Sequence, residues 1–359
     1  MAIDMRVAVG MSGGIDSSVA AAILQQRGFD VIGVTMRVID NDGSVRGSTK
    51  TVKDAQMVGA KLKIPHYVLD LQEAFNNEVI NEFCREYANG RTPNPCISCN
   101  ERIKFGIMLQ KAFGLGAESF ATGHHARLKR DEQGIWHLLK ARDKHKDQSY
   151  FLYRLNQGQM KQILMPVGEY TKEQVRQLAH DFKLPVAEKS ESQEICFVPT
   201  GDYAGFLKKR RPELFRPGPV KDIKGNLVGR HPGFANYTIG QRKGLGIAFG
   251  KRQYVVCIKP GENLIVVGNE NDARSNIAEL ENIHWISGRA SREKFRAVIK
   301  IRSQGLGGAA SVELPDNKTA VVRFDEPQWA ITPGQAAVFY QGDMVLGGGT
   351  IKQSLDGMI

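Results

Sequence analysis

Short apolar runs alternate with longer segments of helical periodicity in the first part of the chain. The runs lie at residues 6–11, 31–36, 66–71 and 119–125, and each has the length of a buried strand. Strands that alternate with helices of this length form βαβ units, whose strands run parallel. The pattern therefore predicts an α/β fold with a Rossmann-like parallel sheet.

The pattern changes in the second half of the chain. A hairpin is expected to turn near Gly134, and beyond it short apolar runs are separated by Gly, Pro and Asn turns down to 336–351. This spacing is typical of small β domains and of a barrel. We expect three domains: an α/β domain at 1–202, a central β-rich domain at 203–270 and a C-terminal β-barrel at 271–359.

Composition and charge narrow the class of protein. The 359 residues are 42% hydrophobic and 24% charged, which is ordinary for a globular protein, and no run approaches the roughly 18–20 apolar residues of a membrane helix. The net charge of +11 is uneven: residues 1–202 hold 26 Lys and Arg against 24 Asp and Glu, whereas residues 203–359 hold 23 against 14. The basic second half favours a polyanionic partner such as nucleic acid, although a basic solvated surface gives the same pattern.

The N-terminus and the cysteine content indicate the cellular compartment. The strand pattern begins within the first residues and leaves no room for a signal peptide, so we expect a cytoplasmic protein with no membrane partner. Thiols stay mostly reduced in that compartment. Five cysteines in a chain of this length do not form a disulfide framework, so paired cysteines are expected to be catalytic or metal-binding.

A glycine-rich stretch, GMSGGIDSSV at residues 10–19, joins the first predicted strand to the first predicted helix. Glycines allow the backbone to turn tightly and approach a ligand, and amides at the positive end of a helix bind anions. The stretch is not a Walker loop, because it has no lysine. Taken alone, it fits either a phosphate loop or a tight turn capped by serine.

The spelling SGGxDS resembles the pyrophosphate-loop (PP-loop) family of ATP-dependent ligases and thiolases. These enzymes cleave ATP to AMP and pyrophosphate and adenylate a carbonyl oxygen. The resemblance implies that the loop holds pyrophosphate, that Asp16 helps to hold a magnesium ion, and that the strand ends at Met36 and Gly123 contact adenine. The implied ATP-binding residues are Gly10, Met11, Ser12, Gly13, Gly14, Ile15, Asp16, Ser17, Met36 and Gly123.

Three of the five cysteines are candidates for chemistry. Cys96 and Cys99 lie in NPCISCN, and Cys196 lies in SESQEICFV. Cys99 precedes a predicted helix, and the positive end of a helix favours a thiolate, so a lowered pKa is expected. A structural zinc site would need a second closely spaced pair, which the sequence lacks. Cys84 and Cys257 fall in a predicted helix and strand and are expected to be buried and inert.

Six segments occur in the order seen in one group of PP-loop enzymes. They are GMSGGIDSSV, TPNPCISCNERIKF, ATGHHARL, DQSYFLY, SESQEICFV and YTIGQRKGLGI, and TPGQAAVFY and DMVLGGGTI follow near the end. By these strings the chain is identified as a member of the tRNA-specific 2-thiouridylase family over nearly its whole length. The resemblance implies an adenylating domain followed by two β domains. It also implies an ATP-dependent sulfurtransferase that replaces the 2-oxygen of the wobble uridine, position 34, of tRNA anticodons with sulfur.

The resemblance further implies how the sulfur travels. A sulfur-donor protein, either a cysteine desulfurase or a relay protein, would load Cys196 with a persulfide. Cys99 would then free the sulfur and be left in a Cys99–Cys196 disulfide, which fits the chemistry of thiolates with a resolving partner. The implied contacts to the target base are Asn94, Pro95 and Cys96. The implied contacts to tRNA are His124, Lys146, Asp147, Gln148, Arg302, Ser303 and Gln335, with the basic run 289–302 as a phosphate-contact strand or, equally, a solvated face.

Cys96 departs from the pattern NPDxxCN of many members, which carry Asp at this position. The thiol would be a weaker acid or base in its place. Alternatively, Cys96, Cys99 and Cys196 would hold an iron–sulfur cluster with one open position. The persulfide route and the cluster route both stay open from the sequence.

Two other functions predict different behaviour. A PP-loop ligase or amidotransferase acting on a small molecule would need neither tRNA nor Cys99 and Cys196. A non-enzymatic RNA-binding protein would consume no ATP in the presence of tRNA. The intact SGGIDS and the retained cysteines weigh against the second function.

Overall fold

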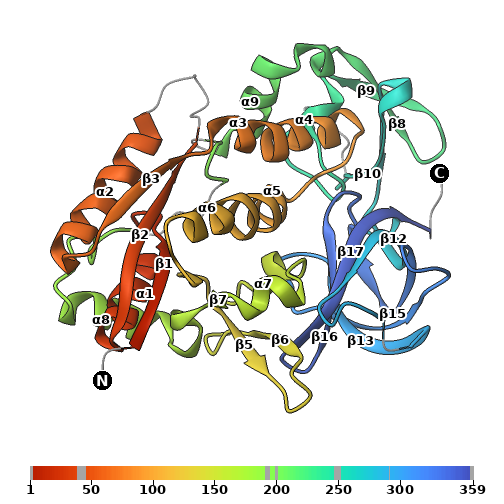
Figure 1. Cartoon of the computed structure of the whole chain (residues 1–359). Helices are drawn as coiled ribbons and strands as arrows, with labels where there is room; N and C mark the ends of the chain where they lie inside the picture. Colours follow the sequence, from red (N-terminus) through yellow and green to blue (C-terminus); the bar gives the residue numbers. More distant parts are fainter. Residues whose placement is uncertain are drawn as a thin grey trace.

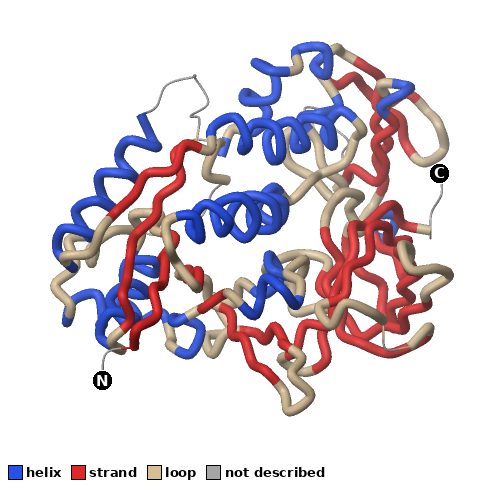
Figure 2. The backbone as a smooth tube through the Cα atoms, in the orientation of Figure 1, coloured by secondary structure: helices blue, strands red, loops and turns tan. Residues whose placement is uncertain are grey.

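The computed structural model describes residues 3–38, 46–190, 195–198, 201–245, 252–290 and 292–355. An α/β unit formed by the first part of the chain stands beside β-rich units formed by the rest (Figure 1). In Figure 2 the helices gather around the N-terminal sheet, whereas strands dominate the region near the C-terminus. The predicted fold class is therefore confirmed.

A five-stranded parallel sheet forms the α/β unit, in the order β3-β2-β1-β4-β7. Its strands are β1 (Ile3–Gly10), β2 (Phe29–Arg37), β3 (His66–Asp70), β4 (Ser119–Thr122) and β7 (Ile163–Leu164). The chain adds β2 and β3 on one side of β1 and then resumes on the other side with β4. Ligands bind parallel sheets where the strand order reverses in this way, which here is the carboxyl end of β1.

Helices cover both faces of this sheet (Figure 1). One face carries α1 (Ile15–Gln26), α2 (Arg46–Leu62) and α8 (Lys172–Asp181). The other carries two long helices with π-helical middles, namely α3 (Gln72–Phe75), η1 (Asn76–Ile80) and α4 (Asn81–Ala88), then α5 (Pro95–Ser98), η2 (Cys99–Met108) and α6 (Leu109–Gly114). Alternate residues of β1 serve the two cores, because Val7 and Val9 pack with α1 while Ala8 packs on the opposite face.

A hairpin connects the α/β unit to the barrel. β5 (Ala126–Arg130) and β6 (Trp136–Lys140) turn near Gly134, as predicted. β6 also pairs with β17 (Met344–Ser354), with Leu139 opposite Met344. The sequence did not indicate this pairing, which extends the barrel sheet into the first unit.

The second half of the chain forms two β units. The central sheet contains β8 (Gly218–Asp222), β9 (Leu227–His231), β10 (Tyr254–Lys259) and β11 (Leu264–Gly268), in the order β10-β11-β8-β9. The last unit contains β12 (Arg274–Trp285), β13 (Lys294–Lys300), β14 (Gly308–Glu313), β15 (Ala320–Trp329), β16 (Ala336–Gln341) and β17. β12 pairs with both β15 and β17, so these six strands close into the predicted barrel.

Shorter helices complete the described structure. They are α7 (Gln157–Lys161), α9 (Tyr203–Arg210) and the 3₁₀ helices η3 (Ser149–Leu152), η4 (Pro166–Glu169), η6 (Pro212–Phe215), η7 (Phe234–Asn236), η8 (Pro260–Glu262) and η9 (Asn271–Ala273). Among the described helices, none combines the length and the apolar character that crossing a membrane requires.

Candidate active site

The glycine-rich loop lies between the end of β1 and the start of α1, at the point where the strand order reverses. The Ser12 amide donates to Ser17 Oγ at 3.2 Å, and Ser17 Oγ donates to the Gly14 carbonyl at 3.2 Å, so the loop closes on itself. Gly13 has a φ of 64°, and a Cβ there would lie 2.7 Å from the Thr51 carbonyl oxygen of α2. The loop therefore needs glycine at this position, both for its backbone conformation and for its close contact with α2.

Asp16, in the first turn of α1, is held by two cationic or hydrogen-bonding partners. Its Oδ1 lies 2.6 Å from Lys172 Nζ and 3.0 Å from His125 Nε2. Burial acts to raise the pKa of Asp16, but the hydrogen bonds and charges of His125 and Lys172 outweigh it and the pKa is lowered. Asp16 is therefore a carboxylate at neutral pH. A carboxylate beside a phosphate loop suits a magnesium ion carried in with a nucleotide, so the residues present fit the predicted metal.

Two lysines reach the loop from distant parts of the chain. Lys172 is the first residue of α8 and is 7% exposed. Lys189 Nζ donates to the Gly13 carbonyl at 2.9 Å and lies 2.5 Å from Asp54 Oδ2 of α2. The loop has no lysine of its own, and these two residues bring positive charge to it from more than 150 residues away.

Sequence reasoning missed both lysines, although one of them left a signal. A cation in the first turn of a helix faces the positive end of the helix dipole and is locally unfavourable. Lys172 occupies that place in a helix whose Thr171–Gln174 capping box is complete. A lysine kept against this local cost indicates a role outside its own helix.

Gly123 and Met36 flank the loop from the two neighbouring strands. Met36 lies near the end of β2, and Gly123 follows β4 directly. A Cβ at Gly123 would lie 2.4 Å from the Ser17 amide nitrogen, so β4 and the start of α1 approach too closely for any side chain. The adenine contacts predicted for these two residues stay predictions, and Gly123 borders the start of α1 where the loop ends.

The helix that carries the thiols begins earlier than predicted. It starts at Pro95, with Asn94 as its N-cap, and Asn94 Oδ1 accepts from the Cys96 amide at 3.2 Å. Cys99 is therefore the fifth residue of a continuous helix and not a residue in front of it. The stretch from Cys99 to Met108 is π-helical, a conformation that often marks functional sites.

The expected lowering of the Cys99 pKa is wrong. The residue is 6% exposed, and burial raises the pKa of its thiol to about 11, although the charge of Lys104 acts in the opposite direction. The helix-end effect was expected to favour the thiolate, but Cys99 lies inside the helix, where loss of hydration dominates. Cys96 and Cys196 are exposed, but the protein around their thiols still removes hydration, which raises the pKa of Cys196 to about 12 and the pKa of Cys96 above its usual value.

These raised pKa values predict slow alkylation at neutral pH. Only the thiolate reacts, so the rate of labelling of Cys99 by iodoacetamide is expected to rise about tenfold per pH unit above pH 7, with no plateau below pH 10. Mass spectrometry of the peptide that contains Cys99 measures this rate. Guanidinium-unfolded protein is the control, because its thiols should titrate near the ordinary value of about 8.5. A plateau between pH 7 and pH 8 in the folded protein would contradict the assignment.

The structure brings the three candidate thiols into one neighbourhood. Cys96 and Cys99 both raise the pKa of Cys196, which requires their charges to lie close to it. Phe197, the next residue, packs edge-on against Phe75 and Phe83 with ring centroids 5.7 and 5.3 Å away, which fixes the Cys196 segment against α3 and α4. All five cysteines lie in described residues, and each is a free thiol. Cys84 is buried and Cys257 half-buried, in agreement with a structural role.

The thiols do not form a ready metal site in this conformation. Within the ranges that the structure describes, no three His, Cys, Asp or Glu side chains are arranged to hold a metal ion. Cys96, Cys99 and Cys196 would have to move closer together to ligate an iron–sulfur cluster. The arrangement therefore fits a set of separate thiols better than a preformed cluster site.

Lys104 and His124 connect the thiols to the phosphate loop. The charge of Lys104 acts to lower the pKa of all three thiols and of His124, and the charge of Asp16 acts on His124 in the opposite direction. His124 is 9% exposed, and burial, the largest effect, keeps it neutral by holding its pKa well below the usual value. Lys104 and His124 therefore link the thiols to the glycine-rich loop electrostatically.

Most of the residues predicted to contact tRNA have partners within the protein. His124 Nδ1 is 2.8 Å from Thr122 Oγ1, Asp147 accepts from the Ser149 amide and hydroxyl, and Gln148 Oε1 accepts from the His125 amide. Arg302 donates to the Trp329 and Ala330 carbonyls at 2.8 Å, and Gln335 Nε2 donates to the Thr92 carbonyl at 2.7 Å. Lys146 and Ser303 are half-buried residues in turns. These contacts give the side chains structural roles, and their predicted contacts to tRNA stay predictions.

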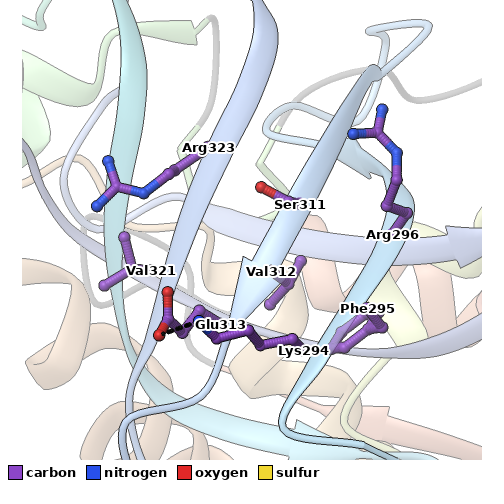
Figure 3. A pocket seen from close by; sticks show the side chains of 8 residues that line it. All are labelled: Lys294, Phe295, Arg296, Ser311, Val312, Glu313, Val321 and Arg323. Atoms are coloured by element: carbon purple, nitrogen blue, oxygen red, sulfur yellow. Dashed lines mark ion pairs between the residues drawn. The ribbon is translucent and has the colours of Figure 1, made fainter.

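The basic run 289–302 lies partly on the outer face of the barrel. A surface hollow of about 370 Å³ is lined there by Lys294, Phe295, Arg296, Ser311, Val312, Glu313, Val321 and Arg323 (Figure 3). Strand register places Arg296, Ser311 and Arg323 in one row across β13, β14 and β15. Lys294 pairs with Glu313 at 2.9 Å and Arg296 with Asp325 at 2.5 Å, so part of this basic charge is already balanced.

Comparison with known proteins gives consistent matches along the whole chain. Residues 5–200 match a family described as the tRNA methyl transferase HUP domain, residues 204–269 its PRC-barrel domain, and residues 275–351 the aminomethyltransferase beta-barrel domain. The chain is 48% identical to the tRNA-specific 2-thiouridylase MnmA of Carboxydothermus hydrogenoformans over 98% of each chain. It is 47% identical to MnmA 1 of Caldanaerobacter subterraneus over 99% of this chain and 100% of that relative.

Solved structures are more distant. The U34-tRNA thiolase NcsA from Methanococcus maripaludis, solved with its 4Fe-4S cluster, is 17% identical, with a TM-score of 0.36 over 59% of this chain and 68% of that chain. A likeness of this size carries no information about function.

Proposed function

The chain belongs to the tRNA-specific 2-thiouridylase family, and on that premise we propose that it is a tRNA sulfurtransferase that forms 2-thiouridine at the wobble position, 34. The observation that carries the proposal is the joint site: a PP-loop signature at the end of β1 and three thiols that share the charge of Lys104. We assign adenylation to residues 1–202 and RNA contacts to the two β domains, 203–270 and 271–359.

The first half of the proposed reaction takes place at the phosphate loop. The 2-oxygen of uridine attacks the α-phosphorus of ATP, pyrophosphate leaves, and the oxygen becomes part of a good leaving group. Lys172 and Lys189 balance the negative charge that grows on the departing pyrophosphate. The loop amides and the positive end of α1 hold its oxygens. Magnesium would neutralise further phosphate charge, and we propose that Asp16 helps to hold it.

The second half takes place at the thiols. A persulfide on Cys196, loaded by a donor protein, attacks carbon 2 with its outer sulfur, and AMP leaves with the former oxygen. The Cys99 thiolate then attacks Cys196 Sγ, which releases 2-thiouridine and leaves a Cys99–Cys196 disulfide. The outer sulfur is reduced by two electrons while the two thiols are oxidised, so an external dithiol must reduce the disulfide before the next turnover.

A thiolate must form before that last step. The raised pKa of Cys99 means that the resting enzyme holds a thiol, which protects it from side reactions. Lys104 already acts to lower the pKa of this thiol and is the cation that would stabilise the thiolate. Asn94, Pro95 and Cys96 precede Cys99 in the same helix start, and we propose that they line the target base.

We favour the persulfide route over an iron–sulfur cluster. A cluster would need Cys96, Cys99 and Cys196 arranged around one metal group, which they are not within the described residues, whereas the persulfide route needs only Cys99 and Cys196 to meet. Anaerobic reconstitution with iron and sulfide separates the two routes. Thiolation by metal-free protein loaded with persulfide is expected, and activity that appears only with a cluster absorption band would favour the cluster.

The family descriptions and the relatives' names differ in the group transferred, methyl against sulfur. A PP-loop signature serves adenylation, which methyl transfer does not require, and thiols that share one site serve sulfur transfer. AMP release tests the adenylation step directly. It is expected only when ATP and tRNA are both present, at one AMP per 2-thiouridine. AMP release without tRNA would favour a small-molecule ligase, and no release at all would favour a protein that only binds RNA.

The row of Arg296, Ser311 and Arg323 is proposed to contact RNA phosphates. Each lost phosphate contact lowers the slope of log affinity against log salt by about 0.9 for a duplex. Arg323→Ala is therefore expected to weaken tRNA binding and to reduce this slope by about one, measured by filter binding from 50 to 200 mM salt. Lys61→Ala on α2 is the control. If the slope of log affinity against log salt stays unchanged, Arg323 does not contact RNA and this face of the barrel is simply exposed to solvent.

A further inference from the structure

Arg91 and Thr92, which lie just before the helix that carries Cys96 and Cys99, contact residues of all three domains. Arg91 forms ion pairs with Glu86 of α4 at 2.8 Å and with Glu281 of β12 at 2.6 Å. Thr92 Oγ1 bonds Thr238 Oγ1 of the central domain at 3.2 Å. One short stretch of chain therefore touches its own domain, the central domain and the barrel.

The barrel holds the backbone of Thr92 from both sides. The Thr92 amide donates to the Pro333 carbonyl at 2.8 Å, and its carbonyl accepts from Gln335 Nε2 at 2.7 Å. Gly334 lies between, with a φ of 90°, and a Cβ there would be 3.0 Å from both the nitrogen and the oxygen of Thr92. The TPGQ segment, residues 332–335, thus fits closely around the backbone of a single residue, Thr92.

The backbone between Thr92 and Cys96 has little conformational freedom. Pro93 and Pro95 fix their own backbone φ angles, and Asn94 caps the helix through the Cys96 amide. Further along that helix, Glu101 pairs with Arg154 at 2.8 Å, and Arg154 donates to Thr350 Oγ1 of β17 at 3.1 Å. The helix is tied to the barrel both before and after Cys99.

The space between the helix and the barrel is small. A cavity of about 40 Å³ lies there, lined by residues that include Asn94, Ser98, Arg154 and Gly334. A cavity of this size holds about one water molecule. The helix start cannot shift toward the barrel without displacing these side chains.

We propose that Gln335 and Thr238 are positioning residues for sulfur transfer, which set the place of Cys96 and Cys99 through Thr92. This inference rests on the proposed function and assigns a chemical effect to both β domains in addition to binding RNA. It also gives a role to the stretch YTIG at residues 237–240, which contains Thr238 and to which the sequence alone assigned no role. The sequence-based alternative for Gln335 is a direct contact to tRNA.

Gln335→Ala separates these two roles. A neutral hydrogen bond is worth roughly threefold to tenfold in a rate, so single-turnover thiolation at saturating tRNA is expected to slow by about that factor. The Kd for tRNA should stay within about twofold of wild type, and the rate of Cys99 alkylation in the RNA-free enzyme should change. Gln328→Ala is the matched control, because Gln328 Nε2 donates to the Glu326 carbonyl within its own strand.

A weakened Kd with a normal single-turnover rate would overturn the proposal in favour of an RNA contact, and so would no change in any quantity. If the Kd and the rate both change, alkylation of Cys99 without RNA decides, because a direct RNA contact cannot alter it. This readout does not depend on thiolation. Failure of the proposed function would appear separately, as wild-type enzyme that makes no 2-thiouridine.

The threonine pair gives a second test that preserves shape. Thr92→Val and Thr238→Val are each expected to slow single-turnover thiolation about threefold, and the double variant should be no slower than either one. Independent, multiplying effects would show that the two hydroxyl groups do not act through each other. Thermal melting of each variant checks that the fold is kept.

Discussion

Replacing Cys99 with serine is expected to abolish thiolation of tRNA, by at least about a thousandfold, while ATP and tRNA still bind. Serine keeps the shape of the side chain, but its hydroxyl neither ionises near neutral pH nor attacks sulfur. Cys196→Ser should be equally inactive, because it removes the sulfur carrier. Cys84→Ser is the matched control in the same domain, since its thiol lies in α4 and is outside the proposed chemistry.

The two inactive variants should differ in what they accumulate. With Cys99→Ser, in a reaction without added dithiol, persulfide loaded on Cys196 is expected to persist, or to stay joined to RNA as a mixed disulfide, because no thiol is present to resolve it. With Cys196→Ser, no persulfide should form on the chain. Intact-protein mass spectrometry after loading distinguishes these states. Wild-type turnover by either variant would remove that cysteine from the mechanism.

Replacing Lys172 with methionine is expected to slow AMP formation by roughly a hundredfold to a thousandfold, the usual effect of losing one preorganised charge at a developing anion. The Nζ of Lys172 lies 2.6 Å from Asp16 Oδ1, and the lysine is almost fully buried. The α8 capping box uses Thr171 and Gln174, so the helix should still form.

The control for Lys172→Met is Lys161→Met, an exposed lysine at the end of α7. AMP formation is measured with ATP and tRNA at saturation, so that a change in KM does not disguise a change in kcat. Circular dichroism verifies the fold. AMP formation within threefold of wild type would show that Lys172 only stabilises the loop and takes no part in adenylation.

The sheet and the barrel could be predicted because their signals are local. A strand that is buried on both faces is an apolar run, and turns need Gly, Pro or Asn, so spacing alone distinguishes the two halves of the chain. The helix start at Pro95 could also have been predicted from the sequence. Asn at the N-cap followed by Pro at the first helical position is a recognised start signal, although the predicted helix begins only after Cys99.

The electrostatics of the thiols could not be predicted from spacing. A reactive Cys99 was expected from its position at a helix end, which is a local feature. Burial is a tertiary property, and it proved to be the larger effect on the pKa of this thiol. The gathering of Cys196 with Cys99 was implied only by the family resemblance, because nothing local links two residues so far apart in the chain.

Contacts between residues far apart in the chain were also beyond the sequence. Lys189 reaches Gly13, and Gln335 reaches Thr92, across 176 and 243 residues of chain. No periodicity or motif spacing marks such pairs. They become visible only once the sheet and the barrel are in place, and they account for much of how the site is held together.

The central claim is tested most directly by mass analysis of tRNA nucleosides. Unmodified tRNA with a wobble uridine is incubated with the enzyme, ATP, magnesium, a persulfide donor and a dithiol, then digested to nucleosides. We expect 2-thiouridine at position 34, a gain of about 16 mass units, in wild type but not in Cys99→Ser or without ATP. Wobble uridine that stays unmodified with the wild-type enzyme, under conditions where persulfide on Cys196 is verified, would contradict the account.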